Sequence, residues 1–226
     1  MYRYYKLCIN AFSAMAIALV VLGCNSSTPE TDSIATTPAA TQTSTANNAQ
    51  ASTEKIKFKQ ANGAEKFSLK FKSDGAKLVD GADAEIARLN LDGNKVKIKD
   101  AADVVIGYVV SQDGYWKLEN AEQTEELYVL RRQDDGDYKL ETGDDTPVYR
   151  VKARDYGYEI ETPAKESLYK VKVKKGKISL RDASEETVLS TKSAMTPAAM
   201  VPFGFDVLTP PQQAALAYAV NLTGGQ

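Results

Sequence analysis

The chain of 226 residues has no histidine and only two cysteines. Histidine is the commonest general base and metal ligand, and a cysteine thiolate is a common nucleophile, so the frequent routes to catalysis are nearly absent. The glycines are spread along the chain, which excludes a phosphate loop and a dinucleotide fingerprint. The 28 basic and 30 acidic residues give no basic excess for nucleic acid. We therefore predict no catalytic residue, no cofactor or metal site and no nucleic-acid partner.

The N-terminal region carries a targeting pattern. Arg3 and Lys6 precede an apolar stretch over residues 11–22, which ends in Val21-Leu22-Gly23-Cys24. This pattern resembles that of a bacterial lipoprotein precursor, whose lipobox ends in such a cysteine. The resemblance implies cleavage after Gly23, attachment of lipid to Cys24 and acylation of the new N-terminus with fatty acids such as palmitate. Several acyl chains anchor a protein stably, because each buried methylene contributes about 0.8 kcal/mol.

Two other interpretations of this region remain open. One is an ordinary secretory signal that happens to precede a cysteine, and the other is an uncleaved anchor, although the apolar stretch is short for a membrane span. Cys8 lies within the segment to be removed, so we expect no disulfide in the mature protein. In Gram-negative lipoproteins, a residue other than aspartate after the lipidated cysteine implies the outer membrane. Asn25 in this position predicts that location if the envelope is Gram-negative.

Residues 25–53 consist almost entirely of Ser, Thr, Ala, Asn, Gln and Pro. Such a composition buries too little apolar surface to fold, which predicts a disordered tether with a reach of about 30 Å. A glycosylated or wall-spanning stalk is the alternative. The predicted organisation is a signal peptide over 1–23, a lipidated N-terminus and tether over 24–54, and one folded domain over 55–226.

The folded region repeats itself about every 20 residues. Two sets of turn dipeptides alternate, and Asp-Gly and Asn-Gly pairs accept the positive φ angles of hairpin turns. The first set is Asp74-Gly75, Asp92-Gly93, Asp113-Gly114, Asp135-Gly136, Tyr156-Gly157 and Lys175-Gly176. The second set is Asn62-Gly63, Asp80-Gly81, Asp100-Ala101, Asn120-Ala121, Thr142-Gly143, Thr162-Pro163 and Asp182-Ala183.

Apolar and polar residues alternate between these turns, as in Phe67–Phe71, Lys95–Lys99, Tyr169–Val173 and Ile178–Leu180. This alternation predicts antiparallel strands with one buried face. A dozen or more short strands avoid open edges by closing into a barrel or by stacking two sheets. Lysine and arginine at every second position of several strands exclude a transmembrane barrel, because lipid would meet them. We predict a mainly β fold of repeated antiparallel hairpins.

The alternation ends near Ser193, and a Pro-containing connector leads to an apolar, alanine-rich segment. Thr209 and Gln212 have the spacing of a capping box, Pro210 suits the first helical position, and Gly224 follows the segment. These signals predict a helix over residues 209–222. Residues 214–220 have no polar side, so this helix is expected to be buried.

Short hairpins followed by one hydrophobic C-terminal helix resemble the tubby-like barrels, a family that includes LURP-one-related proteins and phospholipid scramblases. The resemblance covers residues 55–222. It rests on residues 168–172 (LYKVK), 117–121 (KLENA), 178–183 (ISLRDA) and the apolar run 214–220. It implies a closed or nearly closed barrel around the helix. Seven hairpin units suggest more strands than the family's twelve, and no segment matches the family's phosphoinositide-binding or calcium-binding segments.

Three groups of residues could bind a ligand. Asp134, Asp135 and Asp137 with Asp144 and Asp145 offer oxygen ligands for calcium, but aspartates are common in solvated turns. A cationic ladder could contact anionic lipid or acidic polysaccharide, although a solvated outer face also explains it. Tyr128, Tyr149 and Tyr169, each after an aliphatic residue, could form a carbohydrate platform, but repeated packing positions account for them, and Trp116 has the same ambiguity. The ladder consists of Arg150, Lys152, Arg154, Lys170, Lys172, Lys174, Lys175 and Lys177.

These observations predict a lipid-anchored cell-envelope protein with a non-catalytic binding or structural β-domain. A scramblase-like or lipid-head-group-binding protein, in which the lysines and the helix act on membrane lipid, is the alternative. A carboxylate-based hydrolase is a second alternative, because paired carboxylates are the catalytic groups that the composition leaves.

Overall fold

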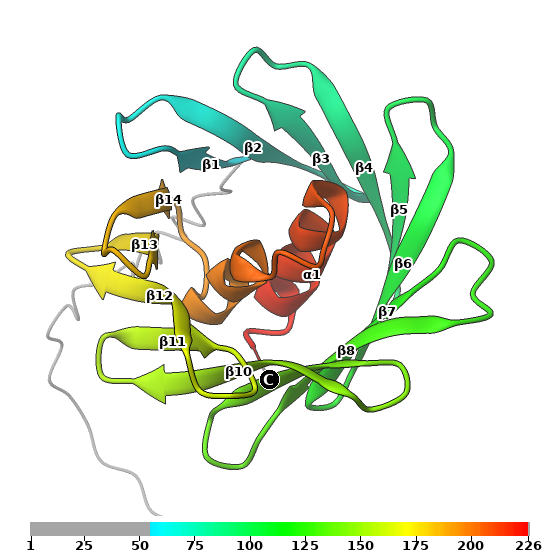
Figure 1. The fold of residues 1–226 in the computed structure, drawn as a ribbon. Helices are drawn as coiled ribbons and strands as arrows, with labels where there is room; N and C mark the ends of the chain where they lie inside the picture. Colours follow the sequence, from blue (N-terminus) through cyan, green and yellow to red (C-terminus); the bar gives the residue numbers. More distant parts are fainter. Residues whose placement is uncertain (1–54, 226) are drawn as a thin grey trace, which may run out of the picture. The chain divides into compact units, whose positions relative to one another are not determined.

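The computed structural model describes residues 55–225, which lie in one compact unit of the chain. Figure 1 shows a ring of strands around two short helical segments. Helix α1 (Pro210–Leu222) and the 3₁₀ helix η1 (Pro197–Gly204) follow the last strand. The strands are β1 (Lys55–Lys59), β2 (Glu65–Lys72), β3 (Gly75–Asp80), β4 (Glu85–Asp92), β5 (Lys95–Asp100), β6 (Val105–Gln112), β7 (Tyr115–Glu119), β8 (Glu126–Arg132), β9 (Tyr138–Thr142), β10 (Pro147–Arg154), β11 (Gly157–Glu161), β12 (Ser167–Lys174), β13 (Lys177–Asp182) and β14 (Thr187–Thr191).

All fourteen strands pair antiparallel with their sequence neighbours, and β1 pairs with β14 to close the barrel. The prediction of a closed or nearly closed antiparallel barrel around a C-terminal helix is confirmed. Every strand predicted from alternation lies within an observed strand. The barrel closes because a meander of hairpins leaves only two edges, and pairing these edges satisfies their backbone groups.

The two sets of turns lie at opposite ends of the barrel. In the first set, the predicted positive φ angles occur at all six glycines, from Gly75 to Gly176. In the second set, the prediction is confirmed at Gly63 but wrong at Gly81 and Gly143, which do not have positive φ. The left-handed residue of these turns comes three positions after the residue that opens the turn. Gly143 is needed for a different reason, because a Cβ there would lie 1.8 Å from the carbonyl oxygen of Glu126.

A β-bulge follows each turn of the second set. Leu78 pairs with Ala87 and Val79 with Glu85, which leaves Ile86 as the extra residue. Such bulges increase the local twist and help a sheet to curve into a barrel. The bulged residue is aliphatic in six of the seven positions and is Lys66 in the first. The aliphatic bulged residues are Ile86, Ile106, Leu127, Val148, Leu168 and Val188.

The two helical segments fill the barrel. Helix α1 packs against β4–β7, while η1 packs against β11–β13. Residues Ala214–Val220 of α1 are all buried, as the absence of a polar side predicted. The predicted helix start is confirmed, since the backbone N–H of Thr209 donates to the Gln212 side chain at 2.9 Å. The sequence did not predict η1, where the connector was expected to be irregular.

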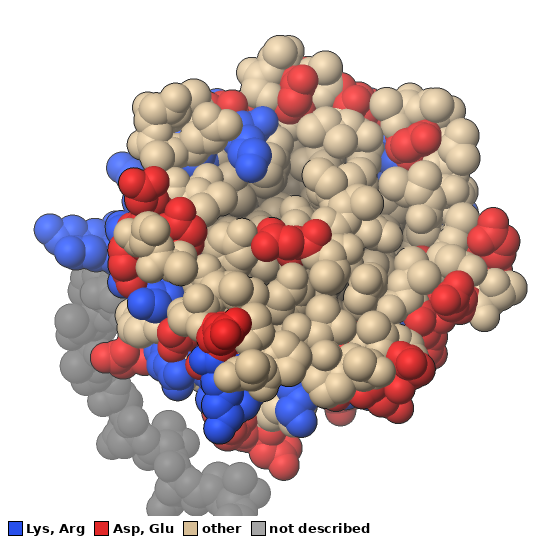
Figure 2. Space-filling model, viewed as in Figure 1, with Lys and Arg blue, Asp and Glu red and all other residues tan. Residues whose placement is uncertain are grey.

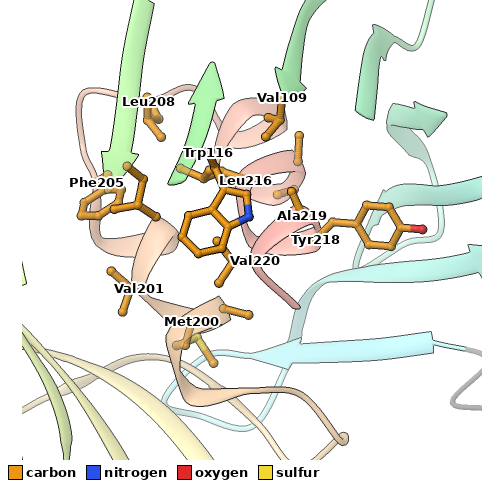
Figure 3. Close-up of a cluster of buried hydrophobic side chains, with 14 of the residues drawn as sticks. Val109, Trp116, Met200, Val201, Phe205, Leu208, Leu216, Tyr218, Ala219 and Val220 are labelled. Carbon is orange, nitrogen blue, oxygen red and sulfur yellow. The ribbon is translucent and has the colours of Figure 1, made fainter. Parts of the chain in front are cut away.

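Alanine makes the helix thin enough to leave room for large side chains from the wall. Figure 3 shows Trp116 of β7 beside Leu216 and Val220 of α1, with Met200 and Val201 of η1 nearby. Trp116 is completely buried. The packed interior is therefore a hydrophobic core, and groups that could meet a ligand lie on the outer surface of the barrel. Within residues 55–225, the structure holds no helix with the length and hydropathy that crossing a membrane requires.

Candidate functional site

The turns of the second set, which we call wide turns, share one local structure. Asp80 opens such a turn, and its side chain accepts hydrogen bonds from the backbone N–H groups of Ala82 and Ala84 at 2.9 and 2.8 Å. Short polar side chains are favoured in turns for this reason. The opening residue is Asp, Asn or Thr in six of the seven turns and Gln60 in the first.

The left-handed position of each wide turn carries a side chain that usually meets a basic residue on the wall. Asp83 lies 2.5 Å from Lys70, Asp103 lies 2.8 Å from Arg88, and Glu185 bridges Lys170 and Lys172 at 2.7 and 2.5 Å. The two lysine ammonium groups lower the pKa of Glu185 to about 2. In four of the seven turns, with Asp145 included, the repeat supplies an acidic partner for its own wall cations.

The other three left-handed positions are Gly63, Gln123 and Lys165. Gly63, in the turn between β1 and β2, has no side chain at all, and a Cβ built there would meet no atom within 4 Å. In the four turns that carry an acid at this position, the acid pairs with the strand before its hairpin, as Glu185 does with β12. For the first hairpin that preceding strand is β14, across the barrel closure. The repeat therefore lacks its acid at the point where the barrel closes.

The closure between β14 and β1 has the least regular pairing in the barrel. One residue pair, Lys59 with Ser190, is in register there, whereas β12 and β13 share six pairs. A groove of about 360 Å³ lies along this closure, and we call it the seam groove. Its lining is Lys57, Lys59, Gln60, Ala61, Gly63, Lys177, Ser190, Thr191, Lys192 and Ser193.

The seam groove holds positive charge that no described acid neutralises. Lys57 pairs with Glu65 at 3.0 Å. Lys59, Lys177 and Lys192 have no carboxylate within 4.0 Å among residues 55–225. Ammonium groups placed together repel one another and attract an anion, so this arrangement favours binding of a negatively charged group.

Hydroxyl groups add neutral donors to the groove. The Thr191 hydroxyl oxygen accepts the backbone N–H of Ser193 at 3.0 Å, and the Ser193 hydroxyl oxygen accepts the N–H of Lys57 at 3.4 Å. Because both oxygens act as acceptors toward the backbone, their hydroxyl protons remain available as donors. Ammonium and hydroxyl donors together form a suitable lining for an oxyanion.

The charge of the whole wall is unevenly divided around this groove. Residues 162–225 and 55–100, which adjoin across the closure, carry 19 basic and 12 acidic residues, while residues 101–161 carry 7 basic and 15 acidic. In Figure 2, acidic side chains predominate near β7–β9, while basic and acidic ones are mixed near β11–β13 and one acidic group lies in the otherwise uncharged middle of this face. The seam groove thus lies in a positive sector, which raises the local concentration of anions.

Two carboxylates of the acidic cluster, Asp137 and Asp144, have partners within the protein. The Asp137 carboxylate accepts the backbone N–H of Ala153 at 2.8 Å and pairs with Lys152, and Asp144 bonds to the Thr142 hydroxyl. Although burial opposes it, the pKa of Asp137 is lowered, because Lys152 and the Ala153 N–H stabilise the charged form. Among residues 55–225, no group of three or more acidic or other ligating side chains is placed to hold a metal ion. Asp134, Asp135, Asp144 and Asp145 are exposed in their turns, whereas Asp137 is buried.

Half of the predicted cationic ladder is paired with carboxylates. Lys170 and Lys172 contact Glu185, Lys152 contacts Asp137, and Arg154 contacts Glu159 at 3.0 Å. These pairs form a solvated outer face, as the alternative interpretation held. Lys177 is the ladder residue that lines the seam groove. The ladder therefore contributes one side chain to the candidate site, rather than forming the site itself.

The predicted aromatic positions belong to the core and its rim. Tyr149 is buried and stacks on Phe205 with ring centroids 5.2 Å apart, and Tyr169 donates a hydrogen bond to Asp206 at 3.1 Å. Tyr128 is partly buried against the core. Each follows the aliphatic bulge residue of its strand, which explains the repeated aliphatic–Tyr pairs. These tyrosines pack rather than forming a carbohydrate platform, and so does Trp116.

The lipid-attachment residue Cys24, the signal peptide and the tether lie outside the described residues. Sequence reasoning missed the seam groove, because its residues come from both ends of the folded region. One signal was present: Gly63 is in phase with Asp83 and Asp103, each 20 residues after the previous one. A glycine in a position where the repeat has an acid indicates a unit that differs from the others.

No family model matches the chain, and neither does a curated protein. Two solved structures show a loose similarity. A protein of Arabidopsis thaliana has 10% sequence identity and a TM-score of 0.37, with 61% of this chain and 79% of that chain covered. An alternansucrase in complex with isomaltononaose has 12% identity and a TM-score of 0.17, with 54% of this chain and 13% of that chain covered. Similarities at these TM-scores carry no argument about function.

Proposed function

We propose that this chain is a lipid-anchored cell-envelope protein whose barrel is a non-catalytic binding module, attached through Cys24 and a flexible tether. The apolar stretch ending in Val21-Leu22-Gly23-Cys24 supports the anchor. The polar composition of residues 25–53 supports the tether, which allows the barrel to reach partners away from the membrane surface. The closed barrel around a C-terminal helix is the architecture that the tubby-like resemblance implied, and a distant relationship to that family is part of this proposal.

The seam groove is the observation that carries the binding role. The interior of the barrel is occupied by α1 and η1, and much of the wall charge is neutralised by cross-strand pairs. The groove differs, because it combines a concave shape with three lysines that have no carboxylate partner among residues 55–225. A binding module therefore uses this part of its outer wall rather than an internal cavity.

The anchor is tested by expressing the full chain in a Gram-negative host and separating membrane from soluble fractions. Wild type and a Cys8→Ala control should be in the membrane fraction, and mass spectrometry should show an acylated N-terminal peptide that begins at Cys24. Cys24→Ala should lack the lipid mass. An unmodified N-terminus in the wild type would disprove the anchor.

A lipid-head-group-binding protein is the second candidate, and the unpaired lysines of the groove favour it. The version in which the helix acts on lipid loses support, because residues 214–220 of α1 are buried inside the barrel. Co-sedimentation of the compact fragment 49–226 with anionic liposomes, at low and raised salt, tests this candidate. Failure to bind at either salt concentration would remove it.

The carboxylate-based hydrolase gains no support from the described carboxyl groups. Every carboxyl whose pKa is shifted has that pKa lowered, as with Glu85 beside Lys77 and Asp103 beside Lys99. A general acid in a carboxylate pair requires the opposite shift, so that it carries a proton near neutral pH.

A further inference from the structure

The seam groove can be compared with the equivalent positions at the other wide turns. In the turns that carry Asp83, Asp103, Asp145 and Glu185, a carboxylate from the left-handed position contacts basic side chains of the preceding strand. In the first turn, that position is Gly63. Strand β14 itself carries no basic residue, but Lys192 follows it directly and has no carboxylate within 4.0 Å among residues 55–225. The barrel is thus built to place an anion here but does not supply one.

Gly63 and Lys192 both line the groove, together with Lys59 and Lys177. The space beside Gly63 is open, since no heavy atom lies within 4 Å of a Cβ placed there. We propose that the seam groove binds a phosphate group, which occupies the place that a carboxylate takes in four other turns. This inference rests on the proposed binding module and names its ligand class.

Phosphate suits the groove better than a single carboxylate does. Three ammonium groups without a carboxylate partner match a dianion, and lysine binds phosphate as a point charge. The hydroxyls of Thr191 and Ser193 can donate to further phosphate oxygens. The surrounding positive sector also favours the approach of the dianion.

The test is calorimetric titration of the full chain, held in non-ionic detergent, with inorganic phosphate at constant ionic strength. We expect a dissociation constant on the order of 1 mM or below and at least about tenfold weaker binding of acetate. Glycerol 3-phosphate and mixed micelles doped with phosphatidic acid distinguish the source of the group. Tighter binding to the doped micelles assigns a lipid phosphate, and equal affinity for all three assigns a free phosphate or soluble ester.

Two substitutions at one position give the sharpest variants. Gly63→Asp places a carboxylate in the groove, with a backbone angle that Asp83 and Asp103 already adopt, and should weaken phosphate binding at least about tenfold. Gly63→Asn is nearly isosteric with Gly63→Asp but uncharged, so it separates the effect of charge from that of filling the space, and it should weaken binding less than Gly63→Asp does. Circular dichroism melts of both variants show whether the barrel is intact.

Two lysine variants distinguish phosphate binding in the groove from a general attraction of phosphate to a positively charged protein. Lys192→Gln should weaken binding several-fold, by about 1 kcal/mol of lost interaction. Lys139→Gln removes one charge from the far wall and should leave affinity unchanged. Equal weakening by both lysine variants, undiminished binding to Gly63→Asp, or no binding by the wild type at about 10 mM phosphate would overturn the inference. Each of these results leaves the Cys24 anchor standing, because that is decided by the N-terminal mass.

Discussion

The closure between β14 and β1 and the junctions elsewhere in the barrel come from one repeat but differ in construction. At the junction of β12 and β13, six residue pairs are in register, and Glu185 neutralises Lys170 and Lys172. At the closure, one pair is in register, and the turn position that carries Glu185 elsewhere carries Gly63. The comparison teaches that a repeat can stabilise most of a barrel while leaving one place open for a ligand.

The first unit also departs from the repeat at its bulge. Lys66 is the extra residue there, whereas the other six units have an aliphatic residue, and four of these residues pack against the core. The loss of an acid and the gain of a lysine both make this region more positive. Lys66 does not line the seam groove, so of the two departures Gly63 is the one that bears on the candidate site directly.

A charge placed in the core should unfold the whole barrel, the closure and the regular junctions together. Leu216→Asp would place a charge without a partner in the packed core, at a cost of more than about 4 kcal/mol. We expect no cooperative melt near that of the wild type by circular dichroism. Leu222→Asp lies on the same helix at a residue that is 49% exposed, and it should melt close to the wild type. An unchanged melt of Leu216→Asp would mean that the helix is not inside the barrel.

Replacing a glycine by alanine should destabilise the barrel more at a regular junction, at Gly143, than at the seam, at Gly63. In Gly143→Ala, the new Cβ would lie 1.8 Å from the backbone oxygen of Glu126, so the strands must shift, which costs about 3 kcal/mol. Gly63→Ala meets open space and bears only the cost of a left-handed alanine, about 1 kcal/mol. Urea unfolding of both variants measures this order, and the reverse order would contradict the geometry.

If the seam groove binds phosphate, added phosphate should raise the free energy of unfolding of the barrel. If phosphate binds the folded barrel alone, a concentration ten times the dissociation constant stabilises it by about 1.4 kcal/mol. We expect a rise in the melting temperature of wild type at constant ionic strength, and no such rise in Gly63→Asp. Sodium chloride at equal ionic strength serves as the control for general salt effects, which should act on both proteins equally.

The ion pairs of a regular junction should show the smallest effect, and it should depend on pH. The pKa of Glu185 is about 2 in the folded chain against an ordinary value of 4.5, so its contribution is complete above pH 4.5 and is lost as the pH falls toward 2. Glu185→Gln should melt slightly below the wild type at pH 7. The two melting temperatures should converge near pH 2, and a difference that persists there would exclude the ion pair as its cause.

Local signals in the sequence were enough to predict much of the fold. The Asp-Gly turns and the alternating segments predicted the strands, because backbone conformation and burial on one face are decided by near neighbours. The cap at Thr209 and the uniformly apolar run predicted a buried helix. The connector containing Pro197 and Pro202 was not recognised as a 3₁₀ helix, since its packing against β11–β13 stabilises it.

Local signals in the sequence could not predict the candidate site. Lys59 and Lys192 are 133 residues apart in the chain, and only closure of the barrel brings them to one groove. The cationic ladder is conspicuous in the sequence because its basic residues are close together, yet half of them, Lys152, Arg154, Lys170 and Lys172, pair with carboxylates in the structure. Whether a charge is paired depends on the register between strands, which local sequence does not specify.

The sequence by itself determined the secondary structure, the repeat and the burial of the C-terminal helix, because these follow from turn chemistry and from the period of apolar residues. Only the tertiary structure decided that the first and last strands pair, and which charges of the wall remain without partners. Both depend on contacts between residues far apart in the chain, and long-range contacts are made when the barrel closes around its helix.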